Sequence, residues 1–105
     1  MLITTTETIG TQAYEVLGLV KGSTIQSKNL GRDFMSGLKT IVGGELHSYT
    51  AMMNEARALA TKRMVEEAQA LGADAIVCAR YSSSSVMSGA AEVMAYGTAV
   101  RLVQA

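Results

Sequence analysis

The chain is poor in charge, in aromatic side chains and in cysteine, and it contains neither proline nor tryptophan. Charged residues make up 17% of the sequence, against about 25% in an average soluble domain. The 9 basic residues balance the 9 acidic ones, so no long-range field draws the chain toward phosphate backbones or anionic lipid. We therefore expect neither nucleic acid nor a membrane surface as a partner.

Other absences bear on location and on domain organisation. Cys78 is the single cysteine, which excludes an internal disulfide and favours a reducing, cytoplasmic location. The first residues lack the pattern of a secretion signal, and no apolar run approaches the roughly 18 to 20 residues of a membrane-spanning helix. Without a linker or an internal repeat, the 105 residues are expected to form a single domain over residues 1–105.

The clearest pattern that is present predicts an amphipathic helix from Met52 to Leu71. Ser48 or Thr50 is a suitable N-cap, and Gly72 supplies the left-handed position that commonly ends a helix. Spacings of three and four residues define its apolar stripe, which consists of Met53, Ala56, Ala60, Met64, Ala68 and Leu71, widened by Met52 and Leu59.

A second, shorter helix is predicted from Asn29 onward, ending at Gly43-Gly44. Two glycines inside it, Gly31 and Gly37, each weaken a helix by roughly 1 kcal/mol relative to alanine. Gly43-Gly44 lacks the spacing and the lysine of a phosphate-binding loop, so a turn between two helices is the preferred interpretation. The apolar residues at near-helical spacing are Leu30, Phe34, Leu38 and Ile41.

Four segments have the composition of β-strands, being rich in Val, Ile, Leu, Tyr and Thr. The last two are expected to pair through a polar loop from Ser83 to Ala91. The order of strands, helices and strands predicts an α+β fold, in which a small antiparallel sheet carries its helices on one side. The predicted strands are Leu2 to Thr5, Tyr14 to Ile25, Ala75 to Ser82 and Glu92 to Val103.

Strict alternation places apolar residues on both faces of the last two strands. Because 49% of the chain is hydrophobic and its net charge is zero, little keeps copies of it apart. A helical layer covers one face of such a sheet, and a second subunit is the simplest cover for the other. We therefore expect a homo-oligomer. The alternating sets are Ala75, Val77, Ala79 and Tyr81 against Ile76, Cys78 and Arg80, and Val93, Ala95, Gly97, Ala99, Arg101 and Val103 against Met94, Tyr96, Thr98, Val100 and Leu102.

Four motifs, in this order along the chain, carry a family resemblance: Arg32-Asp33, Ile41-Val42-Gly43-Gly44, the run from Glu66 to Val77, and Tyr96-Gly97-Thr98-Ala99-Val100. With them the chain resembles the YbjQ family of uncharacterised bacterial proteins over nearly its whole length. The resemblance implies a dodecin-like subunit that assembles as a pentameric ring, with extra short strands at the subunit contacts. It also brings a description of heavy-metal binding without a ligand set, and a glycine often stands where this chain has Cys78.

Three residues are candidates for a metal site: His47, Glu45 and Cys78. Imidazole, carboxylate and thiolate are common metal ligands, but one chain supplies too few of them, so a site would combine copies around a ring. The alternatives are a loop or capping role for His47 and simple packing for Cys78. Arg80 is expected to pair with a carboxylate at a subunit contact, or to stabilise a thiolate at Cys78.

The function that follows is that of a cytosolic homo-oligomer, a pentamer by resemblance, that binds a small ligand or a heavy-metal ion. A metal ion is the candidate cofactor, and no catalytic signature is present. Two other interpretations stay open at this point. One is a small enzyme with an inter-subunit active site that uses His47, Glu45 and Arg80 or Arg32, and the other is a purely structural or partner-binding ring.

Overall fold

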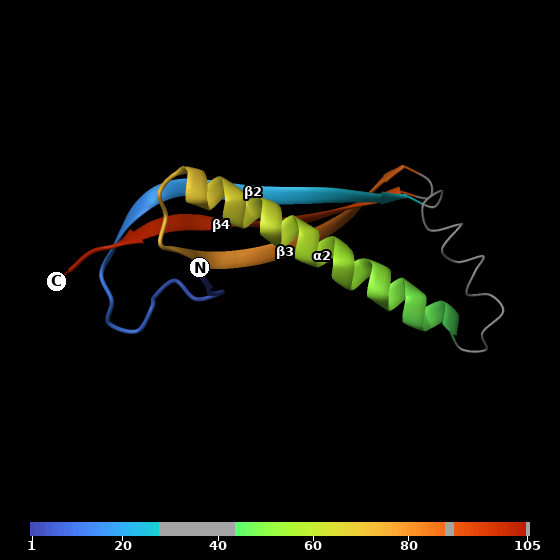
Figure 1. Cartoon of the computed structure of the whole chain (residues 1–105), viewed down its shortest axis with the longest axis horizontal. Helices are drawn as coiled ribbons and strands as arrows, with labels where there is room; N and C mark the ends of the chain where they lie inside the picture. Colours follow the sequence, from blue (N-terminus) through green and yellow to red (C-terminus); the bar gives the residue numbers. More distant parts are fainter. Residues whose placement is uncertain (28–43, 88–89, 105) are drawn as a thin grey trace.

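The computed structural model describes residues 1–27, 44–87 and 90–104, with the backbone alone at 26–27, 44–49, 86–87 and 90. Within these ranges a four-stranded sheet has the strand order β1-β3-β4-β2. A long helix, α2, crosses one face of the sheet obliquely, and both termini lie at the same end of the molecule (Figure 1). The elements are β1 (Leu2–Ile3), β2 (Tyr14–Ser27), α2 (Gly44–Ala70), β3 (Ala75–Met87) and β4 (Ala90–Leu102).

The α+β class is confirmed, but the sheet is mixed and not purely antiparallel. β4 pairs antiparallel with both β2 and β3, as predicted. β1 pairs parallel with β3, through Leu2 with Ala75 and Ile3 with Ile76. A strand of two residues is too short for its sequence to indicate whether it pairs parallel or antiparallel with its neighbour. The helix predicted from Asn29 onward lies outside the described residues.

The predicted polar loop from Ser83 to Ala91 is wrong. β3 and β4 continue as paired strands through this region, with Ser83 opposite Val93 and Ser84 opposite Glu92. Serine favours turns because its hydroxyl competes for backbone hydrogen bonds, and this suggested a loop. Backbone pairing with β4 overrides that weak preference, since strand propensity depends strongly on context.

Helix α2 confirms the predicted apolar stripe at four positions that are each four residues apart. Its start at Gly44 places Ser48 and Thr50 inside the helix, so neither is the N-cap. Leu71 lies beyond the last helical residue and is exposed. At about 1.5 Å per residue, the 27 residues of α2 span about 40 Å. The four fully buried stripe residues are Ala56, Ala60, Met64 and Ala68.

Gly72 ends the helix as predicted, through a Schellman motif. Its φ of 78° lies in the left-handed region, which glycine adopts without steric cost. The N–H of Gly72 donates to the carbonyl of Gln69 at 3.0 Å, and the N–H of Ala73 donates to that of Ala68 at 3.0 Å. These two bonds satisfy carbonyls that the helix itself leaves unpaired.

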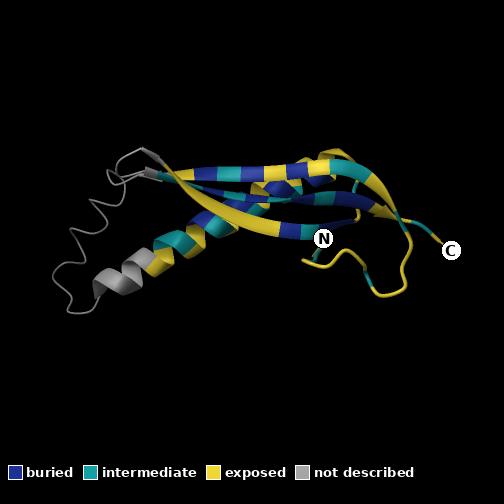
Figure 2. Cartoon of the chain, turned by 180° about the vertical axis from the view of Figure 1, so that it is seen from behind, coloured by how far each residue is buried: buried dark blue, intermediate teal, exposed yellow. Residues whose placement is uncertain are grey.

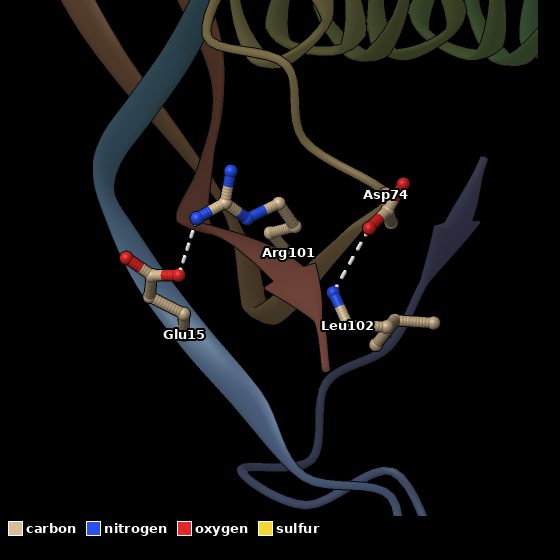
Figure 3. Close-up of polar contacts among 4 residues, drawn as sticks. All are labelled: Glu15, Asp74, Arg101 and Leu102. Atoms are coloured by element: carbon tan, nitrogen blue, oxygen red, sulfur yellow. Dashed lines mark hydrogen bonds and ion pairs between the residues drawn. The ribbon is translucent and has the colours of Figure 1, made fainter. Parts of the chain in front are cut away.

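Asp74, directly after this turn, fixes the end of α2 to β4. Its carboxylate accepts a 2.9 Å bond from the N–H of Leu102, and its own N–H donates to the carbonyl of Val100 at 2.9 Å. Arg101 points to the neighbouring strand and forms an ion pair with Glu15 (Figure 3). The hydrogen bond and the charge of Glu15 raise the pKa of Arg101 above its ordinary value.

Helix and sheet approach each other closely at Gly22 of β2. A Cβ at this position would meet the carbonyl oxygen of Ala60 and the backbone nitrogen of Met64, each at 2.3 Å. Glycine on the strand and alanine on the helix therefore let the two backbones pack together. The helix face of the sheet supplies the rest of this core with Val20, Ile76, Ala79, Val93, Ala95 and Ala99.

Two charged side chains of α2 occupy the outer edge of β2. Glu67 accepts a 3.4 Å bond from the backbone N–H of Lys21. Arg63 donates to the carbonyl of Ser23. These contacts use backbone groups that an edge strand would otherwise offer to another strand.

The contact at Gly22 predicts that Gly22→Ala lowers the free energy of unfolding by about 1–3 kcal/mol or more, because the new methyl group meets backbone atoms that cannot rotate away. Urea unfolding followed by circular dichroism measures the change. Ser23→Ala, on the opposite face of the same strand, is the control and should unfold close to wild type. Equal stability of Gly22→Ala and wild type would contradict this packing.

Candidate functional site: the open face of the sheet

The side of the sheet turned away from α2 is called the open face here. Directly paired residues of neighbouring strands share a face, and successive residues alternate. Buried and exposed residues accordingly alternate along β2 when the chain is seen from behind (Figure 2). In β4 the predicted alternation is confirmed: Val93, Ala95 and Ala99 pack in the core under α2. The next residues, Met94 and Tyr96, therefore belong to the open face.

One end of the open face is covered by the chain itself. Ala75, Val77 and Val100 form a small buried cluster there. Ile9 and Tyr14, from the segment between β1 and β2 and from the start of β2, pack against this cluster. The hydroxyl of Tyr14 donates to the carbonyl of Glu7 at 2.6 Å and so holds that segment in place.

The remainder of the open face is apolar and exposed. Three large aliphatic side chains of β2 lie on it: Val16 is 62%, Leu19 68% and Ile25 58% exposed. Next to them on β4, Met94, Tyr96 and Thr98 are half-buried. Lone exposed aliphatic residues are common, but a row of them on one sheet face indicates a binding surface.

The predicted alternation in β3 is wrong beyond Val77 because the strand contains a β-bulge. Val77 pairs with Thr98 and Arg80 with Tyr96, so Cys78 and Ala79 both stand opposite Gly97. Cys78 has a φ of 55°, which non-glycine residues rarely adopt. The bulge turns Ala79 toward the helix and places Arg80 on the open face. A glycine at this position would adopt the same φ without strain.

A second bulge interrupts β2. Val16 pairs with Val100 and Gly18 with Ala99, so Leu17 is the additional residue. Leu17 packs against the core under α2, and Gly18 has a φ of 149°. After this bulge the odd-numbered residues of β2 lie on the open face, which brings Lys21 there. Lys21 could not be identified as a candidate from the sequence, because its pairing with a residue of β4 is known only from the register of the folded strands.

The three predicted metal ligands come from two different elements of the fold. Glu45 and His47 lie in the first turns of α2, where the structure describes the backbone alone. Cys78 lies in β3 and is partly buried against the cluster that contains Val77 and Val100. In the described ranges, no group of three side chains among His, Cys, Asp and Glu could hold a metal ion. A metal site from these residues would need several copies of the chain.

Arg80 is held by backbone carbonyls. Its Nη1 donates to the carbonyl oxygens of Thr5 and Ala79, both at 2.9 Å. The N–H of Cys78 donates to the carbonyl of Thr6 at 3.0 Å, so the same N-terminal segment contacts both residues. Arg32, the other arginine considered for an active site, lies outside the described residues. None of the helices in the described part of the chain has the length and apolarity to cross a bilayer.

The fold and this surface define a class: a small α+β protein with one helix across a mixed four-stranded sheet and an apolar second face. Residues 1–103 match the sequence model of the YbjQ family, described as "Putative heavy-metal-binding". The chain belongs to this family, as the sequence motifs predicted.

Relatives from other organisms support the assignment. A UPF0145 protein of Alkaliphilus metalliredigens is 63% identical over 98% of this chain and 100% of its own length. One of Clostridium novyi is 60% identical with the same coverage, and one of Thermotoga maritima is 55% identical over 97% of both chains. Among solved structures, a DUF74-family protein from Pediococcus pentosaceus covers 98% of each chain with a TM-score of 0.70 and 16% identity, which shows a shared fold.

The positive φ at Cys78 predicts an unusual order of stability among variants. Cys78→Gly should be more stable than Cys78→Ala by about 1 kcal/mol, since only glycine adopts the left-handed region without a clash. Thermal unfolding of the two variants measures the difference. At Ser83, an exposed strand position without positive φ, the order should reverse. If the alanine variant were more stable than the glycine variant at both position 78 and position 83, the bulge geometry would be contradicted.

Proposed function

We propose that this protein is the subunit of a ring-shaped homo-oligomer, pentameric by its family resemblance, that binds a small ligand between subunits. The open face carries this proposal. Val16, Leu19 and Ile25 expose large apolar side chains beside the half-buried Tyr96. Water contact with this area is unfavourable, at about 25 cal/mol per Å². A neighbouring copy that covers the open face removes that cost.

The charge balance of the chain supports association between identical copies, since its 9 basic residues match its 9 acidic ones. A second copy is a suitable cover because the net charge of zero produces no repulsion between identical chains.

The described side chains favour a small ligand over a metal ion held by one subunit. Cys78 lies in β3 and packs in an apolar cluster, whereas Glu45 and His47 belong to the first turns of α2. The heavy-metal description of the family thus finds no ligand set among the residues that the structure describes in a single chain. The open face, in contrast, combines apolar area with a few polar side chains, as small-molecule sites commonly do.

Sedimentation velocity at micromolar concentration tests the assembly. Wild type should sediment as one oligomer, and Leu19→Asp should reduce it to monomers, because a carboxylate buried at an apolar contact finds no partner there. Tyr96→Asp should have the same effect or should unfold the chain. Leu71→Asp is the matched control, as Leu71 is a similar exposed leucine at the end of α2, and should leave the oligomer intact. A compact wild-type monomer would refute the proposal.

Zinc titration tests the metal candidates separately. Calorimetry on protein purified without a tag should give affinities for Zn²⁺ within about threefold of wild type for Cys78→Ser and for His47→Ala, since the described residues of one chain contain no group of three ligands that could hold the ion. Both variants should assemble as wild type does. Loss of a stoichiometric Zn²⁺ from both variants would show that copies of the chain combine these residues into one site.

A further inference from the structure

Two cations lie in register on the open face, one on each side of an aromatic ring. Lys21 of β2 pairs with Tyr96 of β4, and Arg80 of β3 pairs with the same Tyr96 from the other side. All three residues therefore share one face of the sheet. Neighbouring strands are about 4.8 Å apart, so the α-carbons of Lys21 and Arg80 are separated by about 10 Å. Side chains of this length can reach one small group above Tyr96.

Each cation reaches this face because a β-bulge lies just before it in the chain. Without the additional residue at Leu17, strict alternation from Val16 would place Lys21 under α2. Without the additional residue at Cys78, alternation from Val77 would place Arg80 there as well. The same two bulges direct the side chains of Val20 and Ala79 into the core under α2. β-Bulges frequently redirect a side chain next to a functional site.

The bulge before Arg80 is strained, which is a second observation that points to a site. Cys78 holds a φ of 55°, and non-glycine residues in this region are costly and concentrate at functional positions. The N-terminal segment stabilises this geometry, because the carbonyls of Thr4 and Thr6 accept the N–H groups of Ala79 and Cys78, both at 3.0 Å. Arg80 is anchored to the same segment through the carbonyl of Thr5.

In the described part of the chain, no carboxylate forms an ion pair with either of these two cations. In the described part of the chain the ion pair is that of Arg101 with Glu15, which lies at the end of the sheet. Glu67 accepts from the backbone N–H of Lys21 and makes no ion pair with its ammonium group. Glu92 shares the open face but lies four residues from Tyr96 along β4, about 13 Å away.

We propose that Lys21, Tyr96 and Arg80 form a binding site for a small anion that carries a carboxylate or phosphate group. Arg80 offers a planar donor fork, Lys21 a compact positive charge and Tyr96 a hydroxyl donor on an apolar ring. The exposed Leu19, one row away, borders the site. This proposal rests on the oligomer proposed above, because a neighbouring copy over the open face would shield the anion from water and strengthen both charge contacts.

Calorimetric titration of the full-length protein with inorganic phosphate, and separately with succinate, tests the site. Wild type should bind at least one of the two, and Lys21→Gln and Arg80→Gln should each weaken that binding tenfold or more. Lys62→Gln removes the same charge from an exposed position on α2 and should bind as wild type does. If Arg80→Gln fails to fold for want of its carbonyl contacts, Lys21→Gln alone decides.

Three outcomes would overturn the anion site. The first is a wild-type oligomer that binds neither probe, and the second is equal weakening by Lys62→Gln. The third is dissociation of the oligomer by Glu92→Gln together with absence of binding of both phosphate and succinate, which would assign the two cations to the carboxylate of Glu92 in a second copy. Sedimentation of the same samples separates the proposals: a monomeric wild type refutes the oligomer, whereas an oligomer without binding refutes the anion site alone.

Discussion

The close packing of α2 on β2 at Gly22 is the constraint on which the rest of the structure depends. Ala60 and Met64 contact the strand so closely that no side chain larger than hydrogen fits on its helix face at this point. A long helix in this position lies along one face of the sheet and at its β2 edge, where Glu67 and Arg63 hold backbone groups of the strand. One helix cannot also cover the opposite side. The open face is the direct result of this arrangement.

The helical part of this arrangement could be predicted from the sequence because its signals are local. Apolar residues four apart, such as Ala60 and Met64, mark the buried stripe, and Gly72 marks its end through a left-handed φ that few other residues tolerate. The start of α2 was placed too late. Ser48 and Thr50 are good N-caps when they precede a helix, but their type alone does not exclude a position within one.

The two faces of the sheet could be predicted only where a strand is regular. β4 lies between two partners without a bulge of its own, so simple alternation assigned Val93, Ala95 and Ala99 correctly to the helix face. In β3 the alternation fails at Cys78, because a bulge depends on pairing with a strand about twenty residues further along the chain. Gly18 offers a local signal for the bulge in β2, whereas a cysteine with positive φ offers none. The positions of Lys21 and Arg80 were therefore not accessible from the sequence.

In the proposed assembly, Lys21 and Arg80 couple the association of subunits to the choice of ligand. A metal cation at about 6 Å from one unit charge near a protein surface is disfavoured by about 3 kcal/mol per unit of its own charge, so the row of Lys21, Tyr96 and Arg80 selects against cations and for anions. The apolar side chains around the row, Leu19 among them, are exposed in the single chain and would become buried under a second copy. Burial would lower the local dielectric constant and would make two unneutralised cations costly. An anion between Lys21 and Arg80 offsets that cost, so binding of the anion and association of the subunits should favour each other.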